Sequence, residues 1–233
     1  MLAAGKEIRE NVRVLARTGD TVVREVLRGV DACSEWTHYP AGDVSDPVTH
    51  GLYYYHAHTS AATRDAREHG HFHTFLRASG MPVGVRPAKV AGLARSEIAG
   101  EAMSHLIAIA MDGYGTPIRL FTTNRWVTGE VWYASRDVAA MLDNFAIARA
   151  TPSWPVNRWI GAMLRLFRPQ IASLIRARDE AIAAYPSDNV LEDRALEIPS
   201  ALDIDVERQI AAARAALAKR KRAAAPTSRE SLP

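Results

Sequence analysis

The sequence predicts an α+β protein with an antiparallel β-sheet of about four to five strands, an N-terminal helix and a helical C-terminal half. Helical periodicity marks residues 5–30, aromatic and β-compatible segments dominate residues 52–134, and amphipathic runs interrupted by prolines fill residues 135–185. Strands followed by helices are typical of an α+β domain. We therefore expect one domain over residues 1–200, with a basic helical extension and a disordered tail over residues 201–233.

The N-terminal segment, residues 5–30, carries apolar side chains at spacings of three, four or seven, which predicts a helix. Gly19 and Asp20 mark the point at which this helix would break. Residues 34–51 are rich in Pro, Gly, Asp and Ser, and we expect a loop there.

Four segments between residues 52 and 124 favour strands. Residues 52–58 contain three consecutive tyrosines, and residues 70–77 have a similar aromatic and β-compatible mixture. The clearest pair is 105–112 and 117–124, because the Gly-Tyr-Gly-Thr sequence between them is typical of a hairpin turn. Residues 126–134, which include a glycine, are expected to add a fifth strand or an edge.

After residue 135 the pattern becomes helical. Ser135 is a candidate N-cap for a helix over 137–147, with Asp137 in its first turn. Pro155 and Pro169 then divide a longer amphipathic run whose apolar residues share one stripe. Such a stripe predicts helices packed on a sheet rather than helices lying on a membrane.

Composition indicates a globular protein with a sizeable core, because the 233 residues are 48% hydrophobic. The single cysteine, Cys33, excludes an intrachain disulfide and a CxxC site, and it fits a reducing compartment. The N-terminus lacks the apolar region of a secretory signal, and no stretch reaches the roughly 20 apolar residues of a membrane span. We therefore expect a cytoplasmic protein.

The positive net charge is concentrated near the C-terminus. Six of the 29 basic residues lie within 208–222, where there is no acidic residue, and the remainder has 23 basic against 26 acidic residues. Nucleic-acid-binding proteins usually spread basic residues over a face of the fold. The charge pattern argues against nucleic acid as the partner. The amphipathic stripe argues against a membrane, and we expect a small-molecule substrate or ligand.

The histidines are the most informative feature for function. All eight lie within residues 38–105, and four form the alternating pairs His56/His58 and His71/His73. Side chains two residues apart on a strand share a face. Antiparallel pairing with His56 opposite His73 and His58 opposite His71 would gather four imidazoles, with opposite residues about 5 Å apart. A slip of one residue would send the two pairs to opposite faces.

Clustered imidazoles predict a transition-metal site. Zn or Fe is expected first and Cu, Ni or Mn next, whereas Ca and Mg suit such ligands poorly. The candidate ligands are His56, His58, His71, His73 and His105, with Glu68 and Glu101 as substitutes or supporting groups. Three protein ligands and a water would make an open, catalytic site. The candidates are therefore a small-molecule metalloenzyme, either hydrolase or oxygenase, and a non-enzymatic metal-binding or ligand-sensing module; the alternative without metal is a set of hydrogen-bonding histidines.

Other polar groups are expected near this cluster. The candidate catalytic residues are His73, Tyr54, Glu68 and Arg125. Tyr54 lies two residues before His56, and Phe75 lies two residues after His73, so both rings are expected on the face of the histidines, where they would form an aromatic wall. Arg125 is either an anion clamp or one member of an ion pair, and we favour the ion pair. The charged residues at 64–68 form a lid beside the histidines or a solvated loop.

Two resemblances add to this reading. The strings HYPAGDVSDPVTHGLYYYHAH, GHFHTFLR and LFTTNRWVTGE, within residues 36–148, resemble an uncharacterised bacterial family of unknown function, which implies no activity. His69-Gly-His71-Phe-His73 is similar to the histidine-triad motif of nucleotide hydrolases and transferases, although Gly70 and Thr74 depart from it.

The histidine-triad resemblance implies a different chemistry. It would make His73 a nucleophile toward phosphate and His71 a phosphate-binding group, with no need for metal. That family carries its motif near the end of its domain, whereas here the motif precedes the clearest hairpin. We therefore rank this alternative below the metal hypothesis.

Overall fold

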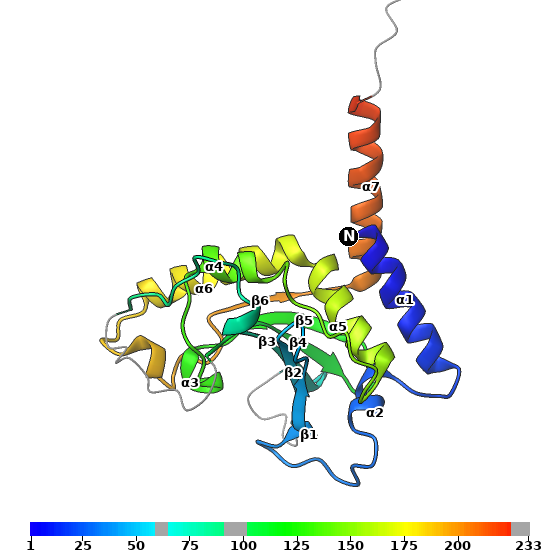
Figure 1. The fold of residues 1–233 in the computed structure, drawn as a ribbon, viewed down its shortest axis with the longest axis horizontal. Helices are drawn as coiled ribbons and strands as arrows, with labels where there is room; N and C mark the ends of the chain where they lie inside the picture. The colour runs from blue at the N-terminus through cyan, green and yellow to red at the C-terminus, as the bar shows by residue number, and fades with distance from the viewer. Residues whose placement is uncertain (59–64, 91–101, 225–233) are drawn as a thin grey trace, which may run out of the picture.

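The computed structural model describes residues 1–58, 65–90 and 102–224. It confirms the α+β class, with a six-stranded antiparallel sheet in the order β1-β2-β3-β4-β5-β6 (Figure 1). The strands are β1 His38–Ser45, β2 Gly51–Ala57, β3 Glu68–Arg77, β4 Met103–Asp112, β5 Pro117–Thr122 and β6 Ser200–Asp203. Each strand therefore pairs with its neighbours along the chain, and the sheet has one strand more than the sequence predicts.

The helices lie before β1, between β5 and β6, and after β6. They are α1 Leu2–Ala16, α2 Val22–Val26, α3 Arg125–Thr128, α4 Ser135–Met141, α5 Trp154–Leu166, α6 Arg168–Ala184 and α7 Val206–Ala224, with 3₁₀ turns η1 Ala78–Gly80 and η2 Val190–Glu192. In Figure 1, α4, α5 and α6 lie along one side of the sheet, and α7 projects from the body. None of the helices in the described part of the chain has the length and apolar character of a membrane span.

One face of the sheet packs against the helices; we call it the helix face. Tyr53, Phe72 and Ile109 point to this side and belong to the main core together with Trp159 of α5. The apolar stripe predicted after residue 150 lies in the same core, where Ile160 is fully buried. The expectation that these helices pack on a sheet is therefore confirmed.

The opposite face of the sheet, which we call the histidine face, carries the residues between those of the helix face. Tyr54 packs there against Phe75, and the imidazoles of His56, His71 and His73 lie beside them. The expected aromatic wall beside the histidines is confirmed, and so is the prediction that both histidine pairs share a face.

The register of β2 against β3 differs from the predicted one by two residues. His56 lies opposite His71 rather than His73, and Tyr54 lies opposite His73. Strand β2 ends at Ala57, so His58 directly follows the strand and lies outside this register. Because a shift of two residues preserves which face a side chain points to, the predicted register is wrong but the predicted face is correct.

The segment 34–51, predicted as a loop, contains β1. This edge strand pairs with β2 through an irregularity between Tyr39 and Val44, where Gly42 and Asp43 have positive φ angles. Proline, glycine and a bulge are tolerated in an edge strand because part of its hydrogen-bonding capacity faces solvent. The loop prediction is therefore wrong for β1, because residues typical of turns also occur in this edge strand.

The segment 126–134, predicted as a strand, forms α3 and an extended connection instead. Asn124 caps α3 by accepting a hydrogen bond from the backbone N–H of Arg125 at 2.8 Å. Gly129 ends the helix in the left-handed conformation, with φ of 63°. This glycine is a helix stop, and the strand prediction is wrong for that reason.

Two predicted helices are shorter than expected. The segment 5–30 divides into α1 and α2, with a positive φ at Gly19 where the break was expected. The helix predicted over 137–147 is α4, which ends at Met141. Ser135 is its first residue rather than its N-cap, and the backbone N–H of Ser135 donates to Asp179 Oδ2 at 2.6 Å.

Gly70 fixes the contact between β2 and β3. A Cβ atom at this position would lie 2.3 Å from the carbonyl oxygen of His56 and 2.6 Å from the hydroxyl of Tyr55. The Tyr55 side chain passes over Gly70, and its hydroxyl is hydrogen-bonded to His69 Nδ1 at 2.8 Å. The glycine therefore makes room for the tyrosine that links the two strands.

We predict that Gly70→Ala lowers the free energy of unfolding by about 1–3 kcal/mol, because backbone and a packed ring must move. Gly113→Ala is the matched control, since nothing lies within 4 Å of its added Cβ and its φ is not positive. Urea unfolding of both variants measures the difference. Equal stability of the two variants would contradict the proposed role of Gly70.

Candidate metal centre

The histidines of the histidine face form a continuous row of imidazoles. Ring centroids are 5.1 Å apart for His56 and His58, 4.8 Å for His58 and His71, and 4.6 Å for His71 and His73. His105 of β4 extends the row, 5.1 Å from His73. The structure thus brings together all five histidines that the sequence nominates as ligands.

Burial increases along this row. His56 and His58 are partly exposed, whereas His71, His73 and His105 are 3%, 1% and 2% exposed. The cluster therefore opens to solvent at the His56 and His58 end and is enclosed at the other.

Two β-bulges bring further members to the cluster. The pairing of β3 with β4 shifts between Glu68 and Gly70, and it shifts again between Thr74 and Phe75. A bulge interrupts the alternation of side chains between the faces. As a result Glu68 lies beside His71, while His69 bonds Tyr55 of the helix face.

The tightest group of potential ligands consists of His58, Glu68 and His71. His71 Nδ1 lies 2.8 Å from Glu68 Oε1 and 3.1 Å from His58 Nε2, and the last two atoms are 3.7 Å apart. Three atoms at these separations lie on a circle of radius about 1.9 Å, slightly less than the length of Zn–N and Zn–O bonds, about 2.0–2.2 Å. One ion just outside their plane can therefore contact all three.

A second group, formed by His56, His71 and His73, is looser. Their potential ligand atoms all lie within 4.8 Å of one another. Ligand atoms on one ion with bonds of about 2.0–2.1 Å are at most about 4 Å apart. Closing this group around an ion requires movements of less than about 1 Å.

His105 supports His73 from behind rather than joining either group. His73 Nδ1 and His105 Nε2 are 3.1 Å apart, and His105 Nδ1 lies 3.4 Å from Thr123 Oγ1. If the Nδ1–H of His73 donates to His105 Nε2, and the Nδ1–H of His105 donates to Thr123 Oγ1, then His73 Nε2 carries a lone pair that can bind an ion. A partner on the other ring nitrogen is the usual way in which proteins orient a metal-binding histidine.

His73 and His105 are neutral at physiological pH. Burial lowers the pKa of His73 well below its usual value of 6.5, and the positive charges that neighbouring imidazoles would carry lower it further. Burial, and then Arg178, lower the pKa of His105 to about 3. Neutral imidazole is the form that binds metal ions.

Aromatic rings border the cluster. Tyr54 stacks on His38 with a centroid distance of 3.6 Å and contacts His73 at 5.1 Å. Phe121 meets the ring of His71 edge-on at 5.0 Å. Burial raises the pKa of the Tyr54 hydroxyl, so this side chain stays neutral and contributes a ring rather than a charge.

A buried carboxyl group that the sequence analysis missed lies behind His105. Glu130 is fully buried, and its Oε2 accepts the backbone N–H of His105 at 2.6 Å. Ser104 Oγ donates to the same oxygen at 3.4 Å. Burial raises the pKa of Glu130 to about 7, although the nearby Arg178 lowers it. Nothing in the strand or helix periodicity marks this residue.

The remaining candidates lie apart from the histidines or outside the described residues. The Arg125 guanidinium pairs with Glu192, as the ion-pair interpretation predicts. Asp65 accepts hydrogen bonds from Arg67 and from Arg119. Arg64 and Glu101 fall outside the described part of the chain.

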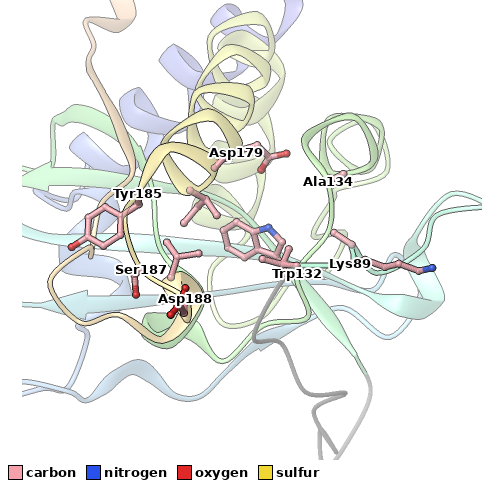
Figure 2. Close-up of a pocket in the computed structure, with 12 residues that line it drawn as sticks. Lys89, Trp132, Ala134, Asp179, Tyr185, Ser187 and Asp188 are labelled. Carbon is pink, nitrogen blue, oxygen red and sulfur yellow. The ribbon is translucent and has the colours of Figure 1, made fainter.

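A separate cavity of about 470 Å³ lies between α6 and the segments around residues 88–90 and 132–134 (Figure 2). Trp132 forms part of its wall, and the guanidinium of Arg178 stacks on that indole at 4.0 Å. Asp179, which also lines the cavity, accepts hydrogen bonds from Arg178 and from the N–H of Ser135. These groups hold α6 against the start of α4, so we assign them a structural role.

We predict that Glu130→Gln removes a pH-dependent part of the stability. Because the pKa of Glu130 is raised from 4.5 to about 7 on folding, the stability gained by protonating it is complete below about pH 4.5 and is lost as the pH rises through 7. The loss is on the order of 3 kcal/mol. Gln keeps an acceptor for the His105 N–H but does not titrate.

Urea unfolding of the wild type and of Glu130→Gln at pH 5 and pH 8 isolates this contribution. Between pH 5 and pH 8, the unfolding free energy of the wild type should fall relative to that of Glu130→Gln. The exposed Glu10→Gln serves as the control. A difference that does not change with pH would refute the assignment.

Comparison with known proteins identifies the family. A model of the DUF6969 domain, described as a domain of unknown function, matches residues 2–204, a range that includes all six strands and the histidine cluster. No curated protein and no solved structure matches the chain. The predicted membership of an uncharacterised family is confirmed, and the chain belongs to the DUF6969 family.

Proposed function

We propose that this protein is a metal-dependent enzyme acting on a small molecule, with a divalent transition metal held by His58, Glu68 and His71. The observation that carries the proposal is the spacing of the three ligand atoms, at 2.8, 3.1 and 3.7 Å. Two histidines and one carboxylate are a common ligand set for Zn²⁺ in hydrolases and for Fe²⁺ in oxygenases.

The arrangement supports catalysis more than storage of an ion. Three protein ligands leave at least one coordination position for water or substrate. His58 is the ligand at the open end, since its side chain is 13% exposed, whereas the Glu68 side chain is 4% exposed and enclosed like that of His71. A bound ion would supply an activated water or polarise a substrate oxygen.

The side chains around the ligand atoms would supply charge and shield the site from water in such a reaction. Glu68 supplies the negative charge that offsets the ion, and Phe121 shields the ring of His71 from water. The rings of Tyr54 and Phe75 provide an apolar wall beside His73. Both rings are buried, at 7% and 0% exposed, so they enclose the His73 end of the cluster and keep water from it.

The histidine-triad alternative has less support. His73 is 1% exposed, and its Nδ1 is hydrogen-bonded to His105. A phosphate would have to reach a neutral, enclosed imidazole to be attacked there. This alternative predicts activity that persists in chelator and is lost on replacing His73 alone.

We predict that natively purified, tag-free protein contains near-stoichiometric Zn or Fe and that Glu68→Gln weakens its binding at least about 100-fold, because a direct anionic ligand becomes neutral. Elemental analysis after dialysis against a competing chelator measures the retained metal. The element found then directs the activity screen, toward hydrolysis for Zn and toward oxygen chemistry for Fe.

The matched control is His69→Gln, on the same strand but bonded to Tyr55 of the helix face. It should retain wild-type metal content. Absence of metal in the wild type after incubation with each candidate ion would refute the proposal, as would equal retention by Glu68→Gln and the wild type.

We also predict that removing the metal destabilises the wild type. An ion present at 1,000 times its Kd adds about 4 kcal/mol to the free energy of unfolding, because the unfolded chain does not hold the ligands together. Thermal unfolding with and without chelator should show a lower Tm in chelator for the wild type and for His69→Gln. An unchanged Tm in the wild type would contradict metal binding to the folded state.

A further inference from the structure

The two groups of potential ligands share one residue, His71. The first group consists of His58, Glu68 and His71, and the second of His56, His71 and His73. His71 meets the first group through Nδ1. An imidazole ring has a second nitrogen, Nε2, whose lone pair points away from the first, so a single histidine can serve two ions.

We propose that His71 bridges two metal ions across the histidine face. The first ion is the one assigned above to His58 and Glu68, so this inference rests on the proposed function. The second ion is held by His73, by the Nε2 of His71 and by the Nδ1 of His56, because the Nε2 of His56 accepts the backbone N–H of Trp36 at 2.9 Å. The bridge requires that the ring of His71 lose its N–H proton to solvent, and two ions on its opposite nitrogens would be about 6 Å apart.

The orientation of His73 supports the second position. Its Nδ1 is engaged by His105, so Nε2 is the nitrogen that can bind an ion. The bulge in β3–β4 pairing and the hydrogen bond from His105 N–H to Glu130 fix the supporting ring in place. A metal-binding histidine held in this way loses little conformational freedom on binding.

The geometry also sets the order of binding. The first group already has the separations that an ion needs, whereas the second must close from separations of up to 4.8 Å. The first group also contains the carboxylate, while the second offers only nitrogen. Repulsion between two cations further weakens the second step, although the negatively charged bridge offsets part of it. We therefore expect two sequential steps, with the second ion bound more weakly.

Copper is a direct probe of the bridge, because two Cu²⁺ ions joined by one imidazolate couple antiferromagnetically, so their paramagnetic resonance signal is lost when it is recorded at liquid-helium temperature. The metal-free full-length wild type is titrated with Cu²⁺ and its integrated spin intensity is recorded. The signal should rise to one spin per chain at the first equivalent and fall during the second. This measurement needs no variant and so does not depend on the folding of one.

Zinc content of the wild type and four variants then assigns the ligands. The wild type should hold two ions per chain, His73→Ala and Glu68→Gln one each, and His71→Ala none at the same free zinc concentration. His69→Gln, the control on the opposite face, should hold two. Circular dichroism checks that each variant is folded, and a variant that is not folded is replaced by the corresponding Asn variant.

The outcomes separate this inference from the proposed function. One ion per chain that is lost in Glu68→Gln, with copper spins that never decline, overturns the bridge and leaves the proposed function intact. Two ions that both survive in His73→Ala also overturn the bridge. No ion in the wild type overturns both.

Discussion

The antiparallel pairing of β2 with β3 is the constraint on which the site depends. With His56 opposite His71, the alternating side chains of both strands place every paired imidazole on one face. A slip of one residue would turn the imidazoles of one strand into the apolar core, where Tyr53 and Phe72 now pack. The contact of Tyr55 across Gly70 opposes such a slip, because only glycine leaves room for that ring.

Electrostatics explains why these imidazoles are suited to a cation. Burial makes protonation of His73 and His105 unfavourable, since an imidazolium would be surrounded by other imidazoles in a poorly solvated environment. Their lone pairs therefore stay available at neutral pH. Glu68 is the carboxylate that touches His71, so negative charge is present where the ligand atoms are closest. Burial at one end and partial exposure at the other give an ion a route from solvent to a prepared set of ligands.

Strand periodicity predicted the shared face of the two histidine pairs but not their exact neighbours. The predicted register was wrong by two residues, which did not matter for the face because the side-chain period is two. Bulges cannot be read from hydrophobic periodicity, and they place Glu68 and His105 within the cluster. The strand β1 was missed because its Pro and Gly residues are typical of loops, and Gly129 was taken for a strand residue although it ends α3. The register, the bulges and the bounds of β1 and α3 thus depend on tertiary contacts that local composition does not specify.

Anomalous diffraction from crystals of the zinc-loaded protein, recorded on both sides of the zinc absorption edge, would locate the bound ion relative to the three ligand atoms. Zinc bound at the proposed site gives an anomalous peak within about 2.0–2.2 Å of His58 Nε2, Glu68 Oε1 and His71 Nδ1. Zinc found only at surface side chains, with His71 Nδ1 still within hydrogen-bond distance of His58 Nε2 and Glu68 Oε1, would contradict this assignment.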